Sequence, residues 1–131
     1  MICYILDDQY GKKIYEWLSH NHDDIIFPIQ DNIFDPLIYI DEIVEQQPDY
    51  ILLDNYFPNR WSWREESLWS EFLKKIQYTS LSSKIICISD YGERLLDQYS
   101  ERQDAYDSGQ IIGFVPSKDP DDIIKAIYST R

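Results

Sequence analysis

The sequence lacks any long apolar run, and it is short of basic residues, cysteine and glycine. No apolar run approaches the roughly 20 residues of a membrane-spanning helix, so no membrane partner is expected. Lys and Arg number 12 against 24 Asp and Glu, which gives a net charge of −12. A chain this acidic repels a phosphate backbone, which argues against nucleic-acid binding. The 4 glycines form neither a linker nor a phosphate-binding loop pattern.

The scarcity of cysteine bears on location. The chain has two cysteines, Cys3 and Cys87, and each lies in an apolar, strand-like run. A cysteine in such a run usually behaves as a small buried hydrophobe, so no disulfide is expected. Residues 1–6 also lack the basic region and cleavage site of a signal peptide. These features predict a cytoplasmic, reducing location.

What the chain does contain is an alternation of apolar runs and helical patterns. Its 131 residues, of which 44% are hydrophobic, suffice for one domain, 1–131, and no output domain is expected after the last helix. The alternation predicts an α/β fold, a doubly wound five-stranded parallel sheet in a three-layer sandwich. The predicted strands are 2–6, 24–29, 50–53, 84–89 and 111–115, and the predicted helices are 12–19, 35–44, 67–78, 93–106 and 119–128.

Two predicted helices carry clear start signals. Asp35 precedes Pro36, and Asp119 precedes Pro120, so each pair supplies a capping carboxylate and a proline for the first helical position. Gln47-Pro48 is expected to end the first of these helices.

Polar residues follow four of the predicted strands. In an open parallel sheet, ligands bind beyond the carboxyl ends of the strands. Crowded carboxylates repel one another, and a bound cation relieves the repulsion; Mg²⁺ suits an oxygen-only site with few protein ligands. The alternative is that these acids merely cap helices and start turns. A site is favoured because the acids recur on two strands, with a hydroxyl and an ammonium on two more. The residues are Asp7 and Asp8, Asp54, Ser89 and Lys118.

The same residues carry a family resemblance. Ile5-Leu6-Asp7-Asp8 resembles the acidic pair that ends the first strand of two-component receiver domains, the CheY-like family. Tyr50 to Pro58 resembles the phosphoacceptor strand, with a proline four residues after Asp54. Ile88-Ser89 and Gly113 to Lys118 resemble the last two strands. The similarity covers essentially the whole chain in order and spacing, and it implies a flavodoxin-like (CheY-like) sandwich.

The resemblance implies a role for each site residue. The chain would be a phosphoacceptor receiver of a two-component phosphorelay, with Mg²⁺-dependent phosphorylation on Asp54 switching a protein-binding surface. No independent enzyme is expected, only Mg²⁺-assisted autophosphorylation and autodephosphorylation. A histidine kinase or phosphotransfer protein would be the donor, and a downstream target protein the reader; oligomeric state is left open. The implied metal ligands are Asp7, Asp8, Asp54 and the backbone carbonyl of Tyr56; Ser89 and Lys118 would contact the phosphoryl group; Ser89 and Phe114 would form the switch.

Three departures from the family pattern keep an alternative open. Lys118 lies one residue later than the family's lysine, and Asp90 stands where the family usually has a small residue. The segment between Ser89 and Phe114 is also longer than is usual in the family. The alternative is a pseudo-receiver, a protein-interaction module that acts without phosphorylation. A hydrolase of the haloacid dehalogenase type is disfavoured, because Tyr56 occupies the place of its second Asp. The polar stretch 91–107 is the predicted docking surface, and Trp61 or Trp63 either covers a loop or anchors a partner.

Overall fold

The described strands form one parallel sheet in the order β1-β2-β3-β4. The computed structural model describes residues 1–54, 68–88, 100–115 and 119–129, apart from the side chains of 68–70 and 100–102. The strands are β1 (Cys3–Leu6), β2 (Tyr50–Asp54), β3 (Lys84–Ile88) and β4 (Ile111–Val115). The α/β class predicted from the alternating pattern is confirmed.

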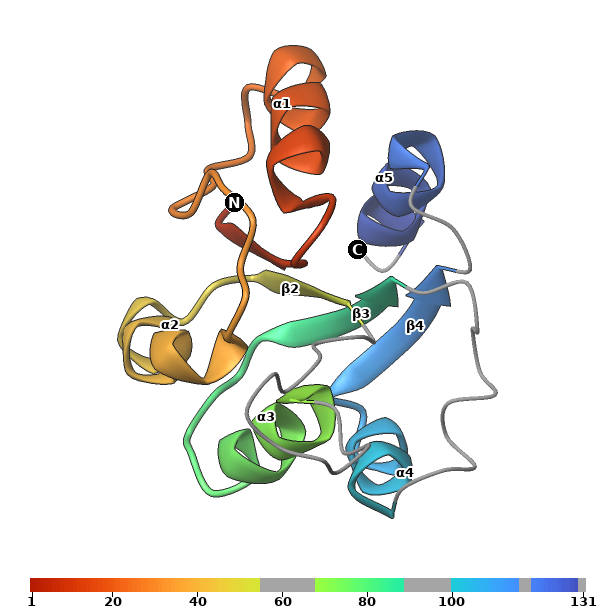
Figure 1. Cartoon of the computed structure of the whole chain (residues 1–131). Coiled ribbons are helices and arrows are strands. Elements are labelled where there is room, and N and C mark those ends of the chain that lie inside the picture. The colour runs from red at the N-terminus through yellow and green to blue at the C-terminus, as the bar shows by residue number, and fades with distance from the viewer. Residues whose placement is uncertain (55–67, 89–99, 116–118, 130–131) are drawn as a thin grey trace.

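Helices cover both faces of this sheet (Figure 1). The helix α1 lies beside α5 on one face, while α2, α3 and α4 cover the other. Their bounds are α1 (Gly11–Asn21), the 3₁₀ turn η1 (Pro36–Tyr39), α2 (Ile40–Gln46), α3 (Leu68–Ile76), α4 (Ser100–Asp107) and α5 (Pro120–Ser129). Helices on both faces require strands that are buried on both sides, and every residue of β1 and β2 is buried.

The predicted count of five strands is wrong for the described residues, which form four. The segment 24–29, predicted as a strand, pairs with the sheet only through one isolated parallel bridge, between Ile2 and Ile26. The Ile26 N–H donates to the Met1 carbonyl at 2.7 Å, and the Cys3 N–H donates to the Ile26 carbonyl at 3.0 Å. The next bond of a parallel ladder would need the N–H of residue 28, which is Pro28 and has none. The ladder therefore stops after one bridge.

The helix start signals behave as the sequence predicts. The Leu37 N–H donates to Asp35 Oδ1 at 2.9 Å, and the Asp121 N–H donates to Asp119 Oδ1 at 3.0 Å. The first of these helices begins as the 3₁₀ turn η1 before it becomes α2. It ends at Gln46, and the next residue, Gln47, has a left-handed backbone (φ 45°) that turns the chain toward β2.

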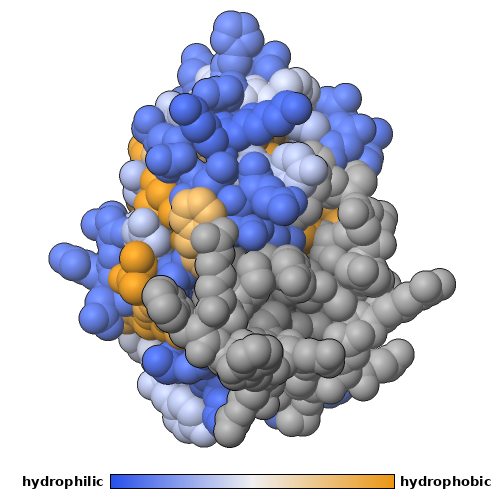
Figure 2. Space-filling view, viewed as in Figure 1, coloured by the Kyte–Doolittle hydropathy of each residue, from blue (hydrophilic) through white to orange (hydrophobic). Residues whose placement is uncertain are grey.

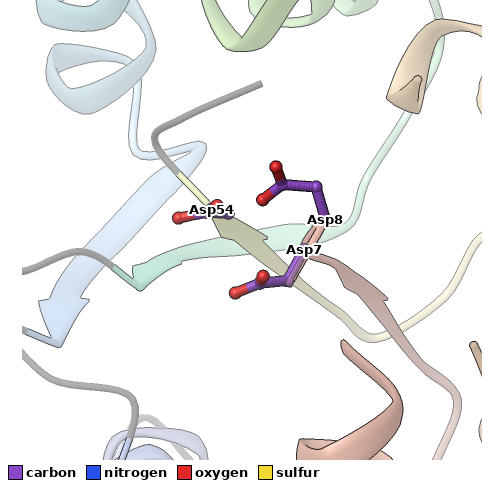
Figure 3. Close-up of side chains that lie close together, drawn as sticks. All are labelled: Asp7, Asp8 and Asp54. Atoms are coloured by element: carbon purple, nitrogen blue, oxygen red, sulfur yellow. The ribbon is translucent and has the colours of Figure 1, made fainter. Parts of the chain in front are cut away.

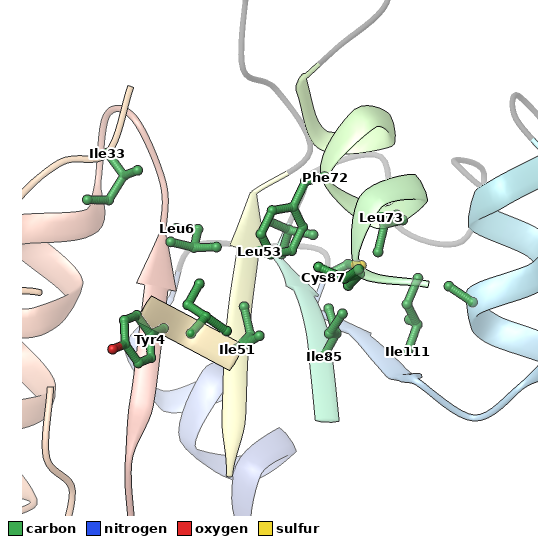
Figure 4. Packing of buried hydrophobic residues seen from close by; sticks show 13 residues of the cluster. Tyr4, Leu6, Ile33, Ile51, Leu53, Phe72, Leu73, Ile85, Cys87 and Ile111 are labelled. Carbon is green, nitrogen blue, oxygen red and sulfur yellow. The ribbon is translucent and has the colours of Figure 1, made fainter. Parts of the chain in front are cut away.

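Two apolar clusters lie on opposite faces of the sheet, as alternating side chains of buried strands require. Figure 4 shows the cluster beneath α2, α3 and α4, which contains Leu53, Phe72 and Cys87. The other cluster contains Cys3 and lies toward α1 and α5. Both thiols are fully buried. Burial and, to a lesser extent, the charge of Asp49 raise the pKa of the Cys3 thiol, so it stays protonated.

Tyr4 is the polar exception in the first cluster, and it yields a prediction. Its side chain is fully buried, and its hydroxyl has no hydrogen-bond partner in the part of the chain that the structure describes. Burial, assisted by the charges of Glu42 and Glu45, raises its pKa from 10 to about 12. Since the folded pKa exceeds the unfolded one, the ionisation of Tyr4 costs stability only as the pH rises through that interval.

The Tyr4→Phe variant is therefore expected to be more stable than the wild type by about 1 kcal/mol at neutral pH, because it removes an unsatisfied buried hydroxyl. Its advantage is expected to grow as the pH rises from 10 toward 12. Urea unfolding at neutral and alkaline pH measures both effects. Tyr78→Phe, at a side chain that is 85% exposed, is the control and is expected to change neither. A destabilised Tyr4→Phe variant would contradict the prediction.

Candidate functional site

Three carboxylates converge at the carboxyl ends of β1 and β2. Leu6 pairs with Leu53 in the parallel register, so Asp7 and Asp54 follow as neighbours on adjacent strands. Asp8 comes next on the turn after β1. One oxygen from each of Asp7, Asp8 and Asp54 lies within 4.8 Å of the others. Figure 3 shows the three carboxylates gathered around the two strand ends. The structure thus brings together the three acids that the strand endings predicted.

Asp7 is the most constrained of the three acids. It is fully buried, and its Oδ1 accepts hydrogen bonds from the backbone N–H groups of Gln9 and Tyr10, each at 2.9 Å. These donors lie at the N-terminal end of α1, where the helix dipole also favours a negative charge. The Asp7 carbonyl accepts the Ile33 N–H at 2.9 Å. The carboxylate is therefore held in one orientation by the chain around it.

Gly11 lets the segment 31–33 pack closely against this corner. A Cβ at Gly11 would lie 3.0 Å from the Asp31 carbonyl and 3.5 Å from the Asn32 Cα. The Asn32 Oδ1 in turn accepts the Lys12 N–H at 3.0 Å. The start of α1 and the segment 31–33 thus form one packed unit behind Asp7, and the absence of a side chain at Gly11 is what permits it.

Gly11→Val is expected to destabilise the fold by about 1–3 kcal/mol, because the new side chain must displace backbone rather than a flexible side chain. The matched control is Gly113→Ala in β4, where a Cβ meets nothing within 4 Å among the described residues. That variant is expected to be neutral or stabilising by less than about 1 kcal/mol. Chemical denaturation measures the free energy of unfolding of both variants. Equal values would show that the close approach at Gly11 does not contribute to stability.

The donor set at this corner fits a small hard cation. All three groups are carboxylates, which suit Mg²⁺ or Ca²⁺ and not a soft metal. Octahedral Mg²⁺ with bonds of about 2.1 Å places adjacent ligand oxygens roughly 3.0 Å apart and opposite ones roughly 4.2 Å apart. One oxygen from each of the three carboxylates lies within 4.8 Å of the others. The three carboxylates could therefore hold such an ion together, and its charge would offset their mutual repulsion.

The remaining predicted site residues divide into those that the structure describes and those that it does not. Ser89, Lys118 and Tyr56 lie outside the described residues, so their roles stay predictions. The same is true of Asp90, Trp61 and Trp63, and of residues 91–99 of the predicted docking stretch.

Phe114, the predicted switch residue, is described. It lies half-buried on β4 and packs against the cluster shared with α3 and α4. Its ring centroid is 6.0 Å from that of Tyr106, with the ring planes inclined at 37°. Phe114 therefore contacts α4 in this structure.

Sequence reasoning missed the residues that position the site. Gln9 and Tyr10 act through backbone N–H groups, which no side-chain pattern reveals. The contact between Tyr106 and Phe114 depends on how α4 packs on β4. Gly11 did carry a signal, since a glycine at the start of a helix suggests a close approach of another segment.

Comparison with solved structures shows the same fold in response-regulator receivers. No protein-family model matches the sequence, and no curated protein matches it. A DNA-binding response regulator of the LuxR family from Staphylococcus aureus superposes with a TM-score of 0.67 at 14% identity, over 98% of this chain and 96% of that one. The response regulator domain of Thermotoga maritima CheB gives a TM-score of 0.62 at 18% identity, over 99% and 90%. The beryllofluoride-activated NtrC receiver domain gives 0.64 at 18% identity, over 99% and 96%.

At these identities the likeness establishes the fold: the chain is built as response-regulator receiver domains are. The described residues form four strands, not the five that the alternating pattern predicted. A separate finding concerns membranes: among the described residues, no helix combines the length and apolar character that crossing a bilayer requires.

Proposed function

We propose that this chain is a phosphoacceptor receiver domain of a two-component phosphorelay, with Asp54 as the acceptor. The observation that carries the proposal is the convergence of Asp7, Asp8 and Asp54 within 4.8 Å at the strand ends of a receiver fold. A structural domain gains nothing from three acids that repel one another in a largely buried corner. A bound cation would offset this repulsion and would also stabilise a phosphoryl group transferred to Asp54.

Asp54 is suited to act as the nucleophile. It is the last residue of β2, it is 7% exposed, and it lies at the carboxyl end of the sheet, where ligands bind in open parallel sheets. One carboxylate oxygen forms the new bond to phosphorus, and the bond from phosphorus to the donor breaks, its electron pair leaving with the donor. The product is an acyl phosphate. In the dephosphorylation step, water attacks phosphorus and the bond from phosphorus to the Asp54 oxygen breaks. This step releases inorganic phosphate and restores the carboxylate.

Asp7 and Asp8 would hold Mg²⁺ together with Asp54, and the proposal adds the backbone carbonyl of Tyr56. When bound, the ion supplies positive charge that offsets the charge on the phosphoryl oxygens. The fixed orientation of Asp7 means that little reorganisation is needed to present the site. Ser89 and Lys118 are proposed to contact the phosphoryl group from neighbouring strands.

The response is proposed to be read by another protein. Ser89 and Phe114 form the switch, and the contact between Phe114 and Tyr106 supplies a route from the site to α4. The donor is proposed to be a histidine kinase or a phosphotransfer protein, and the reader a downstream target protein. The proposal keeps a cytoplasmic location, where such donors act.

The test is an amide NMR titration of the full chain, first with Mg²⁺ and then with beryllofluoride as the phosphoryl mimic. Mg²⁺ is expected to shift resonances at the ends of β1 and β2, and beryllofluoride is expected to add shifts that reach α4 only when Mg²⁺ is present. Shifts from Mg²⁺ without any from beryllofluoride would leave a metal-binding pseudo-receiver. No response to either would remove the proposed function and leave only the fold.

A further inference from the structure

Outside the acidic cluster, η1 and the segment before it present large apolar side chains to solvent. Phe34 is 62% exposed and Ile38 is 71% exposed. Phe34 lies just before η1, and Ile38 lies within it. Figure 2 shows hydrophobic surface gathered over η1, α2 and the segment that precedes them, bordered by hydrophilic surface. Exposed apolar side chains with a polar rim are typical of an interaction site.

The rim of this surface has one sign of charge. Asp31 precedes Phe34 by three residues, and Asp41 and Glu42 follow Ile38 at helical neighbour positions; all three are exposed. No Lys or Arg occurs between Lys13 and Arg60, so every charged side chain of that stretch, histidine aside, is acidic. Along the chain the apolar centre is therefore flanked by acidic side chains, while Lys12, whose N–H donates to Asn32 Oδ1, lies in the first turn of the neighbouring helix α1 beside Asp31.

We propose that the Phe34–Ile38 surface, formed by Phe34, Ile38, Asp31, Asp41 and Glu42, binds a segment of a partner protein that carries an apolar side chain flanked by Lys or Arg. The apolar centre supplies affinity by burying exposed area, and the acidic rim speeds association with a basic partner and rejects acidic ones. The rim also argues against other occupants. A second copy of the chain would bring the same acids face to face, and a nucleic acid or an anionic membrane would be repelled.

This surface is distinct from the acidic cluster and from α4, and it goes beyond the proposed function. A partner could hold the chain through Phe34 and Ile38 whether or not Asp54 carries a phosphoryl group. The expected interaction is thus a docking contact that is independent of phosphorylation.

The test uses the full chain and a fluorescein-labelled synthetic amphipathic peptide with leucines on one face and lysines on the other, followed by fluorescence anisotropy. Phe34→Ser and Ile38→Ser are each expected to weaken binding about tenfold or more. Tyr78→Ser is the apolar control, because Tyr78 is 85% exposed at the end of α3, and it is expected to leave affinity unchanged. Asp41→Asn with Glu42→Gln is expected to reduce the salt dependence, whereas Asp121→Asn on α5, on the other face of the sheet, is not.

Thermal melts confirm that each variant is folded, which is expected because the replaced side chains are exposed. Equal loss of binding in Tyr78→Ser and Ile38→Ser, or no loss in either Phe34→Ser or Ile38→Ser, would overturn the proposal. Concentration-dependent dimerisation of the wild type that Ile38→Ser abolishes would also overturn it, since the occupant would then be a second copy. Failure here leaves the response to Mg²⁺ and beryllofluoride untouched, so the two proposals are tested separately.

Discussion

The Asp54→Asn variant is expected to take up no phosphoryl group from acetyl phosphate, whereas the wild type gains one in the presence of Mg²⁺. The amide that replaces the carboxylate is almost the same size, so the fold at the end of β2 is retained. The amide is a poor nucleophile and cannot form an acyl phosphate. Intact-mass spectrometry with and without EDTA measures the transfer, and cleavage of the product by hydroxylamine identifies it as an acyl phosphate.

The matched control for that experiment is Asp23→Asn, an exposed acid beyond the end of α1. It makes the same change of charge, and its phosphorylation is expected to equal that of the wild type. Phosphoryl uptake by Asp54→Asn at the wild-type level would show that another side chain is the acceptor and that the cluster serves some other purpose.

The Asp8→Asn variant is expected to affect Mg²⁺ binding and stability in opposite directions. Without metal, removing one of three crowded charges relieves repulsion, and the melting temperature in EDTA is expected to rise, corresponding to about 1 kcal/mol. With metal, the loss of a proposed ligand is expected to weaken Mg²⁺ binding by about tenfold or more. The stabilisation that the wild type gains from Mg²⁺ by mass action should therefore shrink or disappear.

Calorimetric melts at several Mg²⁺ concentrations measure both effects in one series. Asp23→Asn again serves as the control and is expected to follow the wild type at each concentration. If Asp8→Asn were less stable than the wild type in EDTA, the carboxylate would be contributing to the fold rather than to a cation site.

Local chemistry made much of this fold predictable. The carboxylates of Asp35 and Asp119 cap helices where the sequence places them, because a cap depends only on residues next to it in the chain. The pairing of 24–29 could not be predicted in the same way. Pro28 matters only because its missing N–H faces the carbonyl of Cys3, and that partner is known only once the strands are placed.

The same distinction applies to the site. Asp7, Asp8 and Asp54 could be grouped from the sequence because carboxyl ends of adjacent parallel strands share one edge of a sheet. The backbone donors of Gln9 and Tyr10, and the ring contact of Tyr106 with Phe114, depend on three-dimensional packing and had no such rule behind them. Ser89, Lys118 and Tyr56 lie outside the described residues, so their roles stay predictions.

The hydrogen bond from Ile33 to the Asp7 carbonyl joins two parts of the molecule that the proposals treat separately. Ile33 immediately precedes Phe34, so the proposed docking surface is linked by this hydrogen bond to the strand end that orients Asp7, a proposed metal ligand. If a partner shifts that tie, the free energy of cation binding changes with it. Thermodynamic reciprocity then requires the cation to alter the partner's affinity by the same factor. This coupling would act through residues 7 and 33 and would not need any change at α4.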